Sequence, residues 1–268
     1  MGKPVFIVAG VGNASGTGAA SAKEFARQLG YRVALVARRL KDLQVIADEI
    51  IANGGEAHPF PVKEYSRDEI VAVFRAVREK WPDSRIKVAL WNASQWSRIP
   101  FLDDIQRSVQ INVVAAFAWS QEAIKAMLEP AEAPLQEGGT GGTVLFTGAT
   151  SSIRGAASFA AFAAGKHGLR ALSQSLAREF GKHDIHVAHV IIDGTILTNT
   201  TKRLFGGRKH VVQTPGNESA AEEGDDWMDD ESRRLDPESV AKAFVWLHQQ
   251  KRDAWTLELD MRPAKEHF

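Results

Sequence analysis

Short apolar runs alternate with longer segments of helical periodicity along most of the chain, and this alternation limits the fold more than any other feature. Runs that are nearly all apolar are typical of strands buried on both faces of a parallel sheet. The helices between such strands cover the two faces of the sheet. We therefore predict one α/β domain over residues 1–268, with a Rossmann-like, doubly wound parallel sheet of about seven strands and helices on both faces.

The predicted strands are Val5–Ala9, Arg32–Val36, Glu56–Phe60, Lys87–Trp91, Gly142–Thr147, His186–Ile192 and Thr256–Leu259. The predicted helices are Gly18–Leu29, Lys41–Asn53, Arg67–Trp81, Asp104–Leu128, Ala157–Phe180 and Pro237–Gln249. One long segment, residues 205–235, breaks the alternation and contains glycine pairs and an acidic cluster. A loop of that length is either functional or disordered. A lid over a substrate pocket and a solvated insertion both remain open.

Composition excludes several classes of function. The 33 basic and 33 acidic side chains balance, so no global field favours nucleic acid or anionic lipid as a partner. The absence of cysteine excludes disulfides, thiolate catalysis and Cys-based zinc sites, and we predict no metal site. No stretch approaches the ~20 apolar residues of a membrane helix, and no cleavable signal peptide is visible. We expect a cytoplasmic protein without membrane partners.

A glycine-rich loop joins the first predicted strand to the first predicted helix. Its residues Gly12, Ser15, Gly16, Thr17 and Gly18 lie where glycines allow a pyrophosphate to approach the backbone. The free N–H groups and the positive dipole end of the following helix favour the same anion. We predict dinucleotide binding here, with a purely structural turn as the alternative.

The end of the second predicted strand bears on the choice of dinucleotide. An acid there would hold the ribose diol of NAD, whereas an arginine accommodates the 2′-phosphate of NADP. The chain has Arg38 and Arg39 and no acid at this point. We predict NADP(H), with Arg38 on the phosphate and Arg39 stacked on adenine. The alternative is that both arginines only solvate the start of the next helix.

The chain from about residue 5 to about residue 200 resembles the short-chain dehydrogenase/reductase family. The loop from Gly12 to Gly18 is similar to that family's TGxxxGxG motif, with Val11 in the threonine position. Further similarities are Trp91-Asn92-Ala93-Ser94 to NNAG, Asn112 to the helix asparagine of the active-site tetrad, Lys166 to the lysine of YxxxK, and Asp193–Thr198 to PGxxxT.

The resemblance implies cofactor contacts beyond the glycine loop. They are Asn92 and Ala93, Val62 near the adenine, Lys166 at the nicotinamide ribose, and Gly194, Ile196 and Thr198 at the carboxamide. It also implies a small carbonyl or alcohol as substrate and assembly into homodimers or homotetramers.

Two tetrad positions depart from the family pattern. Phe162 stands where the family has its catalytic tyrosine, and Ala149 stands where it has its serine. Neither Tyr31 nor Tyr65 lies on the half of the sheet that would hold nicotinamide. We predict that Lys166 and Asn112 remain catalytic and that Ser151 replaces the missing oxygen ligand, because alternation in an extended chain would aim it to the same side as Ala149. The alternative is that residues 150–152 form a capped turn.

Three functions are compatible with these residues. The first is an NADP(H)-dependent oxidoreductase with atypical proton delivery. The second is a non-catalytic scaffold or sensor of the same fold that binds NADP(H). The third is a reaction without net redox on the same scaffold. We favour the first, because a retained lysine and helix asparagine have less purpose in a scaffold.

Overall fold

A parallel sheet forms the centre of the computed structural model, which describes residues 2–96, 102–129, 140–205 and 228–266. Seven strands pair in the order β3-β2-β1-β4-β5-β6-β7, and each pairing is parallel. The order reverses between β1 and β4, which creates the switch point where such sheets bind ligands. The predicted Rossmann-like, doubly wound fold is confirmed. The strands are β1 (Val5–Ala9), β2 (Arg32–Ala37), β3 (Glu56–Pro61), β4 (Ile86–Trp91), β5 (Gly142–Thr147), β6 (Ile185–Ile192) and β7 (Glu258–Met261).

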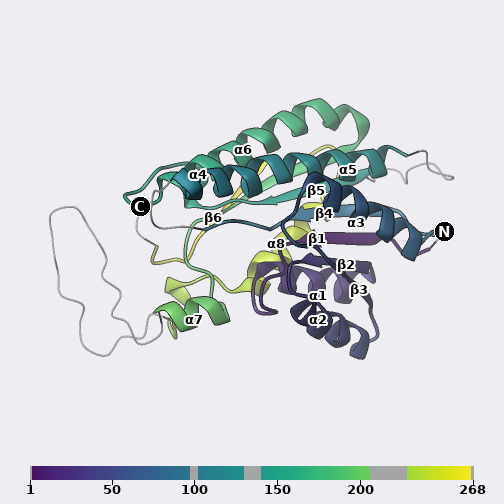
Figure 1. Ribbon diagram of the computed structural model, residues 1–268, viewed down its shortest axis with the longest axis horizontal. Helices are drawn as coiled ribbons and strands as arrows, with labels where there is room; N and C mark the ends of the chain where they lie inside the picture. Colours follow the sequence, from purple (N-terminus) through teal and green to yellow (C-terminus); the bar gives the residue numbers. More distant parts are fainter. Residues whose placement is uncertain (1, 97–101, 130–139, 206–227, 267–268) are drawn as a thin grey trace.

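Helices cover both faces of the sheet (Figure 1). One layer holds α3, α4, α5 and α6, and the other holds α1, α2 and α8. The described helices are α1 (Thr17–Leu29), α2 (Leu40–Ala52), α3 (Arg67–Lys80), α4 (Leu102–Val109), α5 (Ala116–Leu128), α6 (Ala160–Phe180), α7 (Asn199–Phe205) and α8 (Pro237–Gln249). None of them is long and apolar enough to cross a membrane.

Alternation along each strand divides the interior into two cores. In β1, Ile7 belongs to the core beneath α3, α5 and α6, whereas Phe6 and Val8 belong to the core beneath α1, α2 and α8. Successive side chains of a strand point to opposite faces, so one apolar run supplies both cores. This double burial is the reason that the inner strands such as β1 and β5 are mostly apolar, whereas the edge strands β3 and β7 are only partly buried and carry polar residues.

The structure differs from the predicted helices at one point that bears on the site. The helix predicted over Asp104–Leu128 is interrupted by a π-helical turn, η1 (Gln110–Ala115), between α4 and α5. Such turns occur frequently at functional sites, and this one contains Asn112. Of the predicted lid or insertion, residues 206–227 lie outside the described residues, so the lid stays a prediction.

Candidate active site

The glycine loop after β1 packs directly against the backbone at the end of β4. Gly10 has a φ of +86°, and a Cβ placed on it would lie 2.3 Å from the amide nitrogen of Ala93. A Cβ on Gly18 would lie 2.5 Å from the carbonyl oxygen of Gly10. Only glycine allows both the left-handed conformation and these close approaches. The loop therefore turns tightly and delivers the N-terminus of α1 to the carboxyl edge of the sheet.

The N-terminus of α1 has the features of an anion site. Gly16 is its N-cap and provides no side-chain cap, and the first turn of the helix carries no acid. The Oγ1 of Thr17 is buried and has no hydrogen-bond partner among the described residues. An unsatisfied buried hydroxyl costs about 1 to 3 kcal/mol, which a phosphate oxygen at this position would recover. The residues present thus fit the pyrophosphate of a dinucleotide.

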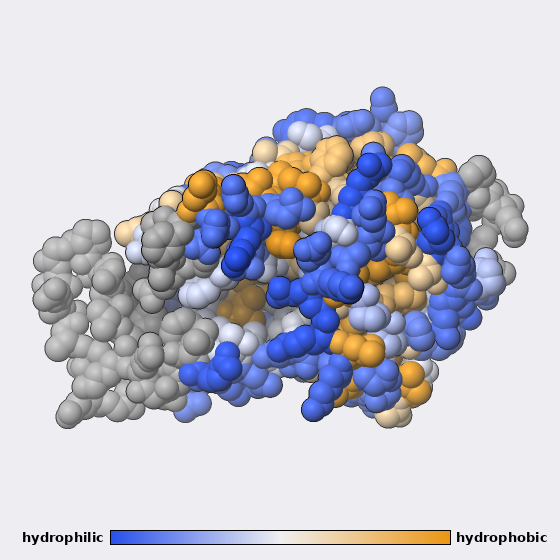
Figure 2. Space-filling model, in the orientation of Figure 1, coloured by the Kyte–Doolittle hydropathy of each residue, from blue (hydrophilic) through white to orange (hydrophobic). Residues whose placement is uncertain are grey.

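A cleft of about 1110 Å³ opens beside this loop. Figure 2 shows the surface hollowed on the side that Figure 1 places beyond the carboxyl ends of the strands. The residues that line the cleft include Gly10, Gly12, Arg38, Arg39, Glu64, Tyr65, Ser66, Asn92, Ala93, Gln106, Arg107 and Gln110. Six of the predicted cofactor contacts are therefore brought together at this cleft. Five of them line it: Gly12, Arg38, Arg39, Asn92 and Ala93. The sixth, Val62, follows β3 and donates its backbone N–H to the carbonyl oxygen of Ala37, which is another lining residue.

The two arginines at the end of β2 differ in their contacts. Arg39 pairs with Asp42 at 2.5 Å within the first turn of α2. Arg38 is exposed and has no hydrogen-bond or ion-pair partner among the described residues. Burial raises the pKa of the Tyr65 hydroxyl to about 12, and the charge of Arg38 opposes that rise. Arg38 therefore lies beside the buried floor of the cleft with its charge unpaired.

The side chain of Asn92, at the end of β4, forms hydrogen bonds to residues at the ends of β1 and β5. Its Nδ2 donates to the carbonyl oxygen of Gly10 at 2.7 Å, and its Oδ1 accepts from the hydroxyl of Thr147 at 2.8 Å. Both ends of the amide are thus engaged within the protein. The side chain links the ends of β1, β4 and β5, and the N–H of Asn92 donates to the carbonyl oxygen of Ala9. The carbonyl group of Asn92 and the backbone of Ala93 therefore remain for a ligand.

The segment after β6 reaches back to the glycine loop. Ser15 donates to Asn13 and accepts from the backbone N–H of Asn199, and Asn13 donates to Thr200. The hydroxyl of Thr198 accepts from the N–H of Thr201 at the start of α7. Ile196 bridges to Leu235. Asn13 and Ser15 therefore join the glycine loop to the start of α7, whereas Thr198 bonds within the turn that begins α7 and Ile196 pairs with Leu235.

Lys166 is a buried cation on α6. Its side chain is 3% exposed, and its Nζ donates to the carbonyl oxygen of Thr147 at 2.8 Å. Burial lowers the pKa of the ammonium group to about 7. The ring of Phe162, one turn earlier, lies with its centroid 5.6 Å from Nζ. An ammonium has three N–H donors, and one of them is used by Thr147.

Asn112 is buried in the π-helical turn η1 and faces α6. Its Oδ1 accepts from Ser94 at 3.0 Å, and its Nδ2 donates to Ser108 at 3.2 Å. A Cβ on Gly165 would lie 2.9 Å from this Nδ2, so α6 passes very close at the residue before Lys166. The structure thus brings Asn112 into the neighbourhood of Lys166.

The turn after β5 distributes its three hydroxyls differently. The Oγ of Ser152 accepts from the N–H of Ala149 at 3.0 Å, so Ser152 caps the turn. Thr150 donates to Asp193 at 2.5 Å. Ser151 is buried and makes no hydrogen bond to the described residues. The capped-turn alternative is therefore confirmed: residues 150–152 form a 3-10 turn capped by Ser152, and not the extended segment from which the role of Ser151 was predicted. Within this turn the hydroxyl of Ser151 makes no hydrogen bond to the described residues.

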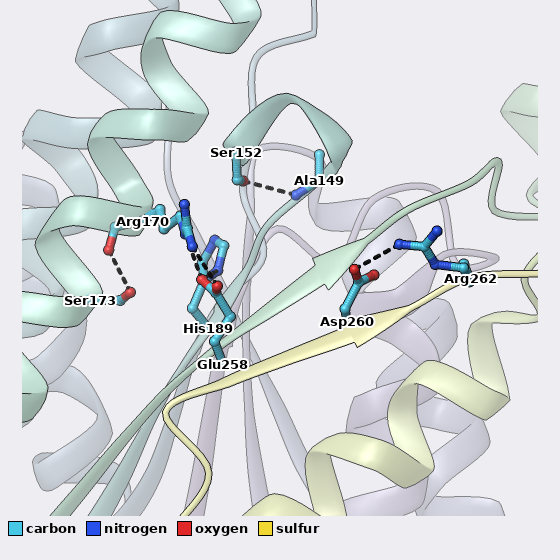
Figure 3. A network of polar contacts seen from close by, with 8 residues as sticks. All are labelled: Ala149, Ser152, Arg170, Ser173, His189, Glu258, Asp260 and Arg262. Carbon is cyan, nitrogen blue, oxygen red and sulfur yellow. Dashed lines mark hydrogen bonds and ion pairs between the residues drawn. The ribbon is translucent and has the colours of Figure 1, made fainter. Parts of the chain in front are cut away.

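A polar network anchors α6 one turn beyond Lys166 (Figure 3). Arg170 makes two hydrogen bonds of 2.7 Å to Glu258 on β7, and Glu258 also contacts Nδ1 of His189 at 3.1 Å. Arg170 holds the pKa of the Glu258 carboxyl below its ordinary value, and burial lowers the pKa of His189 to about 4. This network fixes the height of α6 above the sheet, and with it the position of Lys166.

Both tyrosines are bonded away from Lys166. Tyr31 pairs with Nε2 of His248 at 2.8 Å, and Tyr65 contacts the carbonyl oxygen of Val36 at 3.4 Å. Sequence reasoning missed Arg107, Gln106 and Gln110 of the cleft and the partner of Thr150. The hydrophilic face of α4 was the available signal for Gln106 and Arg107, and Gln110 continues it at the start of η1. No local pattern marks the contact between Thr150 and Asp193.

The family model described as short chain dehydrogenase matches residues 6–209. This range is most of the chain, and the protein therefore belongs to the short-chain dehydrogenase/reductase family. The fold is that of an oxidoreductase of this type.

Relatives with reductase activities in their names match much of the chain. The mouse (Mus musculus) 3-oxoacyl-[acyl-carrier-protein] reductase is 27% identical over 198 residues, which cover 72% of this chain and 76% of the relative. The A-factor type gamma-butyrolactone 1'-reductase (1S-forming) of Streptomyces virginiae is 28% identical over 243 residues, covering 88% and 85%.

Solved structures of the same fold cover nearly the whole chain. A short-chain dehydrogenase from Rhodopseudomonas palustris has a TM-score of 0.71 and 29% identity, covering 97% of this chain and 98% of the other. A variant of actinorhodin polyketide ketoreductase solved with NADPH has a TM-score of 0.78 and 22% identity, covering 99% and 98%.

Proposed function

We propose that this protein is an NADP(H)-dependent oxidoreductase that transfers hydride to or from a small alcohol or carbonyl compound, with proton delivery that does not use a tyrosine. The observation that carries this proposal is Lys166, a buried ammonium at the ligand-binding edge of the sheet with N–H donors left for a ligand. A buried cation is costly to fold, so its retention favours a functional role.

The cofactor contacts proposed from the sequence divide into three groups along the site. The loop Gly12–Gly18, with Ser15, Gly16 and Thr17, would hold the pyrophosphate, and Arg38 would bind the 2′-phosphate, with Arg39, Val62 and Ala93 around the adenosine. Lys166 would bind the nicotinamide ribose, and Gly194, Ile196 and Thr198 would bind the carboxamide. When bound, the nicotinamide supplies hydride transfer; this chain supplies orientation and proton movement.

Phe162 and Ala149 define what is atypical in the proposed site. The phenyl ring of Phe162 lies beside the Lys166 ammonium, where a tyrosine hydroxyl of the family would act. Ala149 presents a methyl group where a serine would bind the substrate oxygen. We propose that Ser151 takes over as oxygen ligand, because its hydroxyl is not committed within the described residues, and that Asn112 orders the surroundings of Lys166.

The choice of NADP(H) rests on Arg38. Its guanidinium has no ion-pair partner within the described part of the chain, and the lining of the cleft contains no acid at the end of β2. A solved structure of the same fold that holds NADPH is consistent with this choice. Assembly into dimers or tetramers stays a prediction of family membership.

The test is turnover by the purified protein. We expect oxidation of alcohols with NADP⁺, or reduction of aldehydes, ketones or quinones with NADPH, measured by the absorbance of the reduced nicotinamide. The Phe162→Tyr, Ala149→Ser double variant should raise ordinary carbonyl reduction. Tight NADPH binding without turnover on any substrate would instead support the scaffold alternative. Absence of NADPH binding would refute both.

A further inference from the structure

The ends of β5 and β6 present a polar pair that the proposed chemistry has not used, and β5 is the strand whose last residue, Thr147, accepts a hydrogen bond from Lys166. Thr150 follows β5 directly after Ala149, and Asp193 follows β6. Strands β5 and β6 are parallel neighbours with Thr147 opposite Val190, so both residues lie at the carboxyl edge of the sheet. That edge is where a doubly wound fold binds its ligands.

The contact within the pair is a short hydrogen bond in which only the acceptor is charged. The Oγ1 of Thr150 donates to Oδ1 of Asp193 at 2.5 Å. This distance is typical of a hydroxyl bonded to a carboxylate, which is about twice as strong as a bond between neutral groups. Asp193 is 4% exposed, so water competes little for its oxygens.

The carboxylate is held in place from its other side. Arg262, just after β7, contacts Oδ2 of Asp193 at 3.1 Å and Asp260 at 2.8 Å. Figure 3 shows Arg262 beside Asp260 on β7, and Ala149 on the turn that follows β5. The backbone N–H of Asp193 also donates to the carbonyl oxygen of Met261.

Gly194 makes this arrangement possible. Its φ is +156°, and a Cβ placed on it would lie 2.6 Å from Pro263, the residue after Arg262. Any side chain there would push the C-terminal segment away and remove Arg262 from Asp193. Met261 fixes the backbone of Asp193, and Arg262 holds its carboxylate with Oδ1 toward Thr150.

We propose that Thr150 and Asp193, the Thr150–Asp193 pair, form the proton path that replaces the missing tyrosine, with Thr150 as the catalytic group and Asp193 as the positioned base behind it. This inference rests on the proposed function. During alcohol oxidation, the substrate O–H bond breaks and its proton passes to Oγ1 of Thr150. The hydroxyl proton of Thr150 passes to Oδ1 of Asp193. The two electrons of the C–H bond leave as hydride to NADP⁺, and a carbonyl forms. After the product leaves, the proton on Asp193 returns through the half-buried Thr150 hydroxyl to water.

The polarity of the pair also selects the substrate. Because the Thr150 hydroxyl donates to a carboxylate, its oxygen offers lone pairs and accepts a hydrogen bond from a ligand. A hydroxyl group can donate to that oxygen, whereas a carbonyl cannot. The pair therefore favours binding of an alcohol with ionised Asp193, and by reversibility it reduces a carbonyl only when Asp193 carries the proton.

The experiment compares Asp193→Asn, Thr150→Val and Thr150→Ser with wild type in alcohol oxidation, over a panel of small secondary alcohols. Asp260→Asn is the matched control, since it removes a carboxylate from the same guanidinium without touching Thr150. Loss of a positioned proton-transfer group lowers kcat by roughly 10² to 10⁴-fold. We expect that loss in Asp193→Asn and Thr150→Val, with the Kd for NADP⁺ within about threefold of wild type in both. KM should stay within about threefold in Asp193→Asn and rise in Thr150→Val, which loses the contact to the substrate hydroxyl. We expect recovery in Thr150→Ser and nearly full activity in Asp260→Asn.

A second readout does not depend on turnover. A hydroxyl proton held this tightly by a carboxylate resonates far downfield in the proton NMR spectrum of the protein without cofactor. It should be present in wild type and Asp260→Asn and absent in Thr150→Val and Asp193→Asn. Wild-type turnover with Asp193→Asn retaining more than about a tenth of kcat would overturn the Thr150–Asp193 pair and leave the proposed function intact. No turnover in wild type would overturn both.

Discussion

Replacement of Lys166 by methionine should stabilise the protein and remove part of its pH dependence. The side chain is 3% exposed, and burial lowers the pKa of its ammonium group from 10.5 to about 7. That difference corresponds to a penalty of about 5 kcal/mol on the folded state when the group is fully protonated. Because the side chain is buried, solvent screening reduces this figure little.

The direction of the pH dependence follows from which state binds the proton more tightly. The unfolded chain keeps the proton up to pH 10.5, whereas the folded protein releases it near pH 7. The penalty is therefore complete below pH 7 and is relieved as pH rises toward 10.5. Between about pH 6 and about pH 9, the free energy of unfolding of wild type should rise by about 3 kcal/mol more than that of Lys166→Met.

At neutral pH the variant should be more stable than wild type by about 2 to 3 kcal/mol, after the loss of the hydrogen bond to Thr147 is subtracted. Urea unfolding of the cofactor-free protein at several pH values measures both effects. Ser173→Ala, which removes a buried hydroxyl from the same helix without removing a charge, should keep the wild-type slope. Parallel pH profiles for wild type and Lys166→Met would refute the assignment of Lys166 as a buried cation with a lowered pKa.

Three further predictions use other parts of the structure. Arg38→Ala should weaken NADPH binding by roughly 10- to 100-fold, because it removes a charge-assisted contact to the 2′-phosphate, and it should change NADH binding little. Fluorescence titration measures both dissociation constants, and equal losses for the two cofactors would contradict the role given to Arg38. Burial lowers the pKa of His248 to about 4, below the 6.5 of the unfolded chain, so folding excludes its proton and stability falls as pH drops from 6.5 toward 4. His248→Gln should remove about 3 kcal/mol of that loss of stability at acid pH. If urea unfolding shows the same loss of stability below pH 6.5 in the variant and in wild type, the prediction is wrong. Gly10→Ala should destabilise the fold by more than roughly 2 kcal/mol, because it combines a positive φ with a clash against Ala93. Gly12→Ala, with a φ of +72° and open space around a Cβ, is its control and should cost less in thermal unfolding.

Almost all of the fold could be predicted from the sequence. Apolar runs such as Val5–Ala9 and Gly142–Thr147 coincide with β1 and β5, because burial on both faces is visible in the residues of the strand itself. The glycine loop could also be predicted, since the left-handed φ of Gly10 and its close approach to Ala93 need glycine. The break at η1 was not predicted, because the apolar periodicity runs through it without a proline or glycine.

The candidate site could be predicted only in part, because the sequence places residues along elements and does not give their long-range contacts. The spacing of strands and helices in the sequence predicts that three residues reach the same edge of the sheet, and the structure brings them there: Arg38, Asn112 and Lys166. What each side chain contacts is a different matter. Asn92 was predicted as a cofactor contact, yet both ends of its amide bind Gly10 and Thr147. Arg39 pairs with Asp42, and Arg38 does not.

By itself, the sequence determined the doubly wound sheet, the glycine loop, and the order in which the site residues reach the carboxyl edge. These properties depend on local periodicity and on residues within one or two turns of each other. Only the tertiary structure decided that Thr150 meets Asp193, and that Arg262 holds that carboxylate from beyond the last strand. The three residues are far apart in the chain, and their contact depends on strand pairing and on the space that Gly194 leaves open, neither of which a linear pattern records.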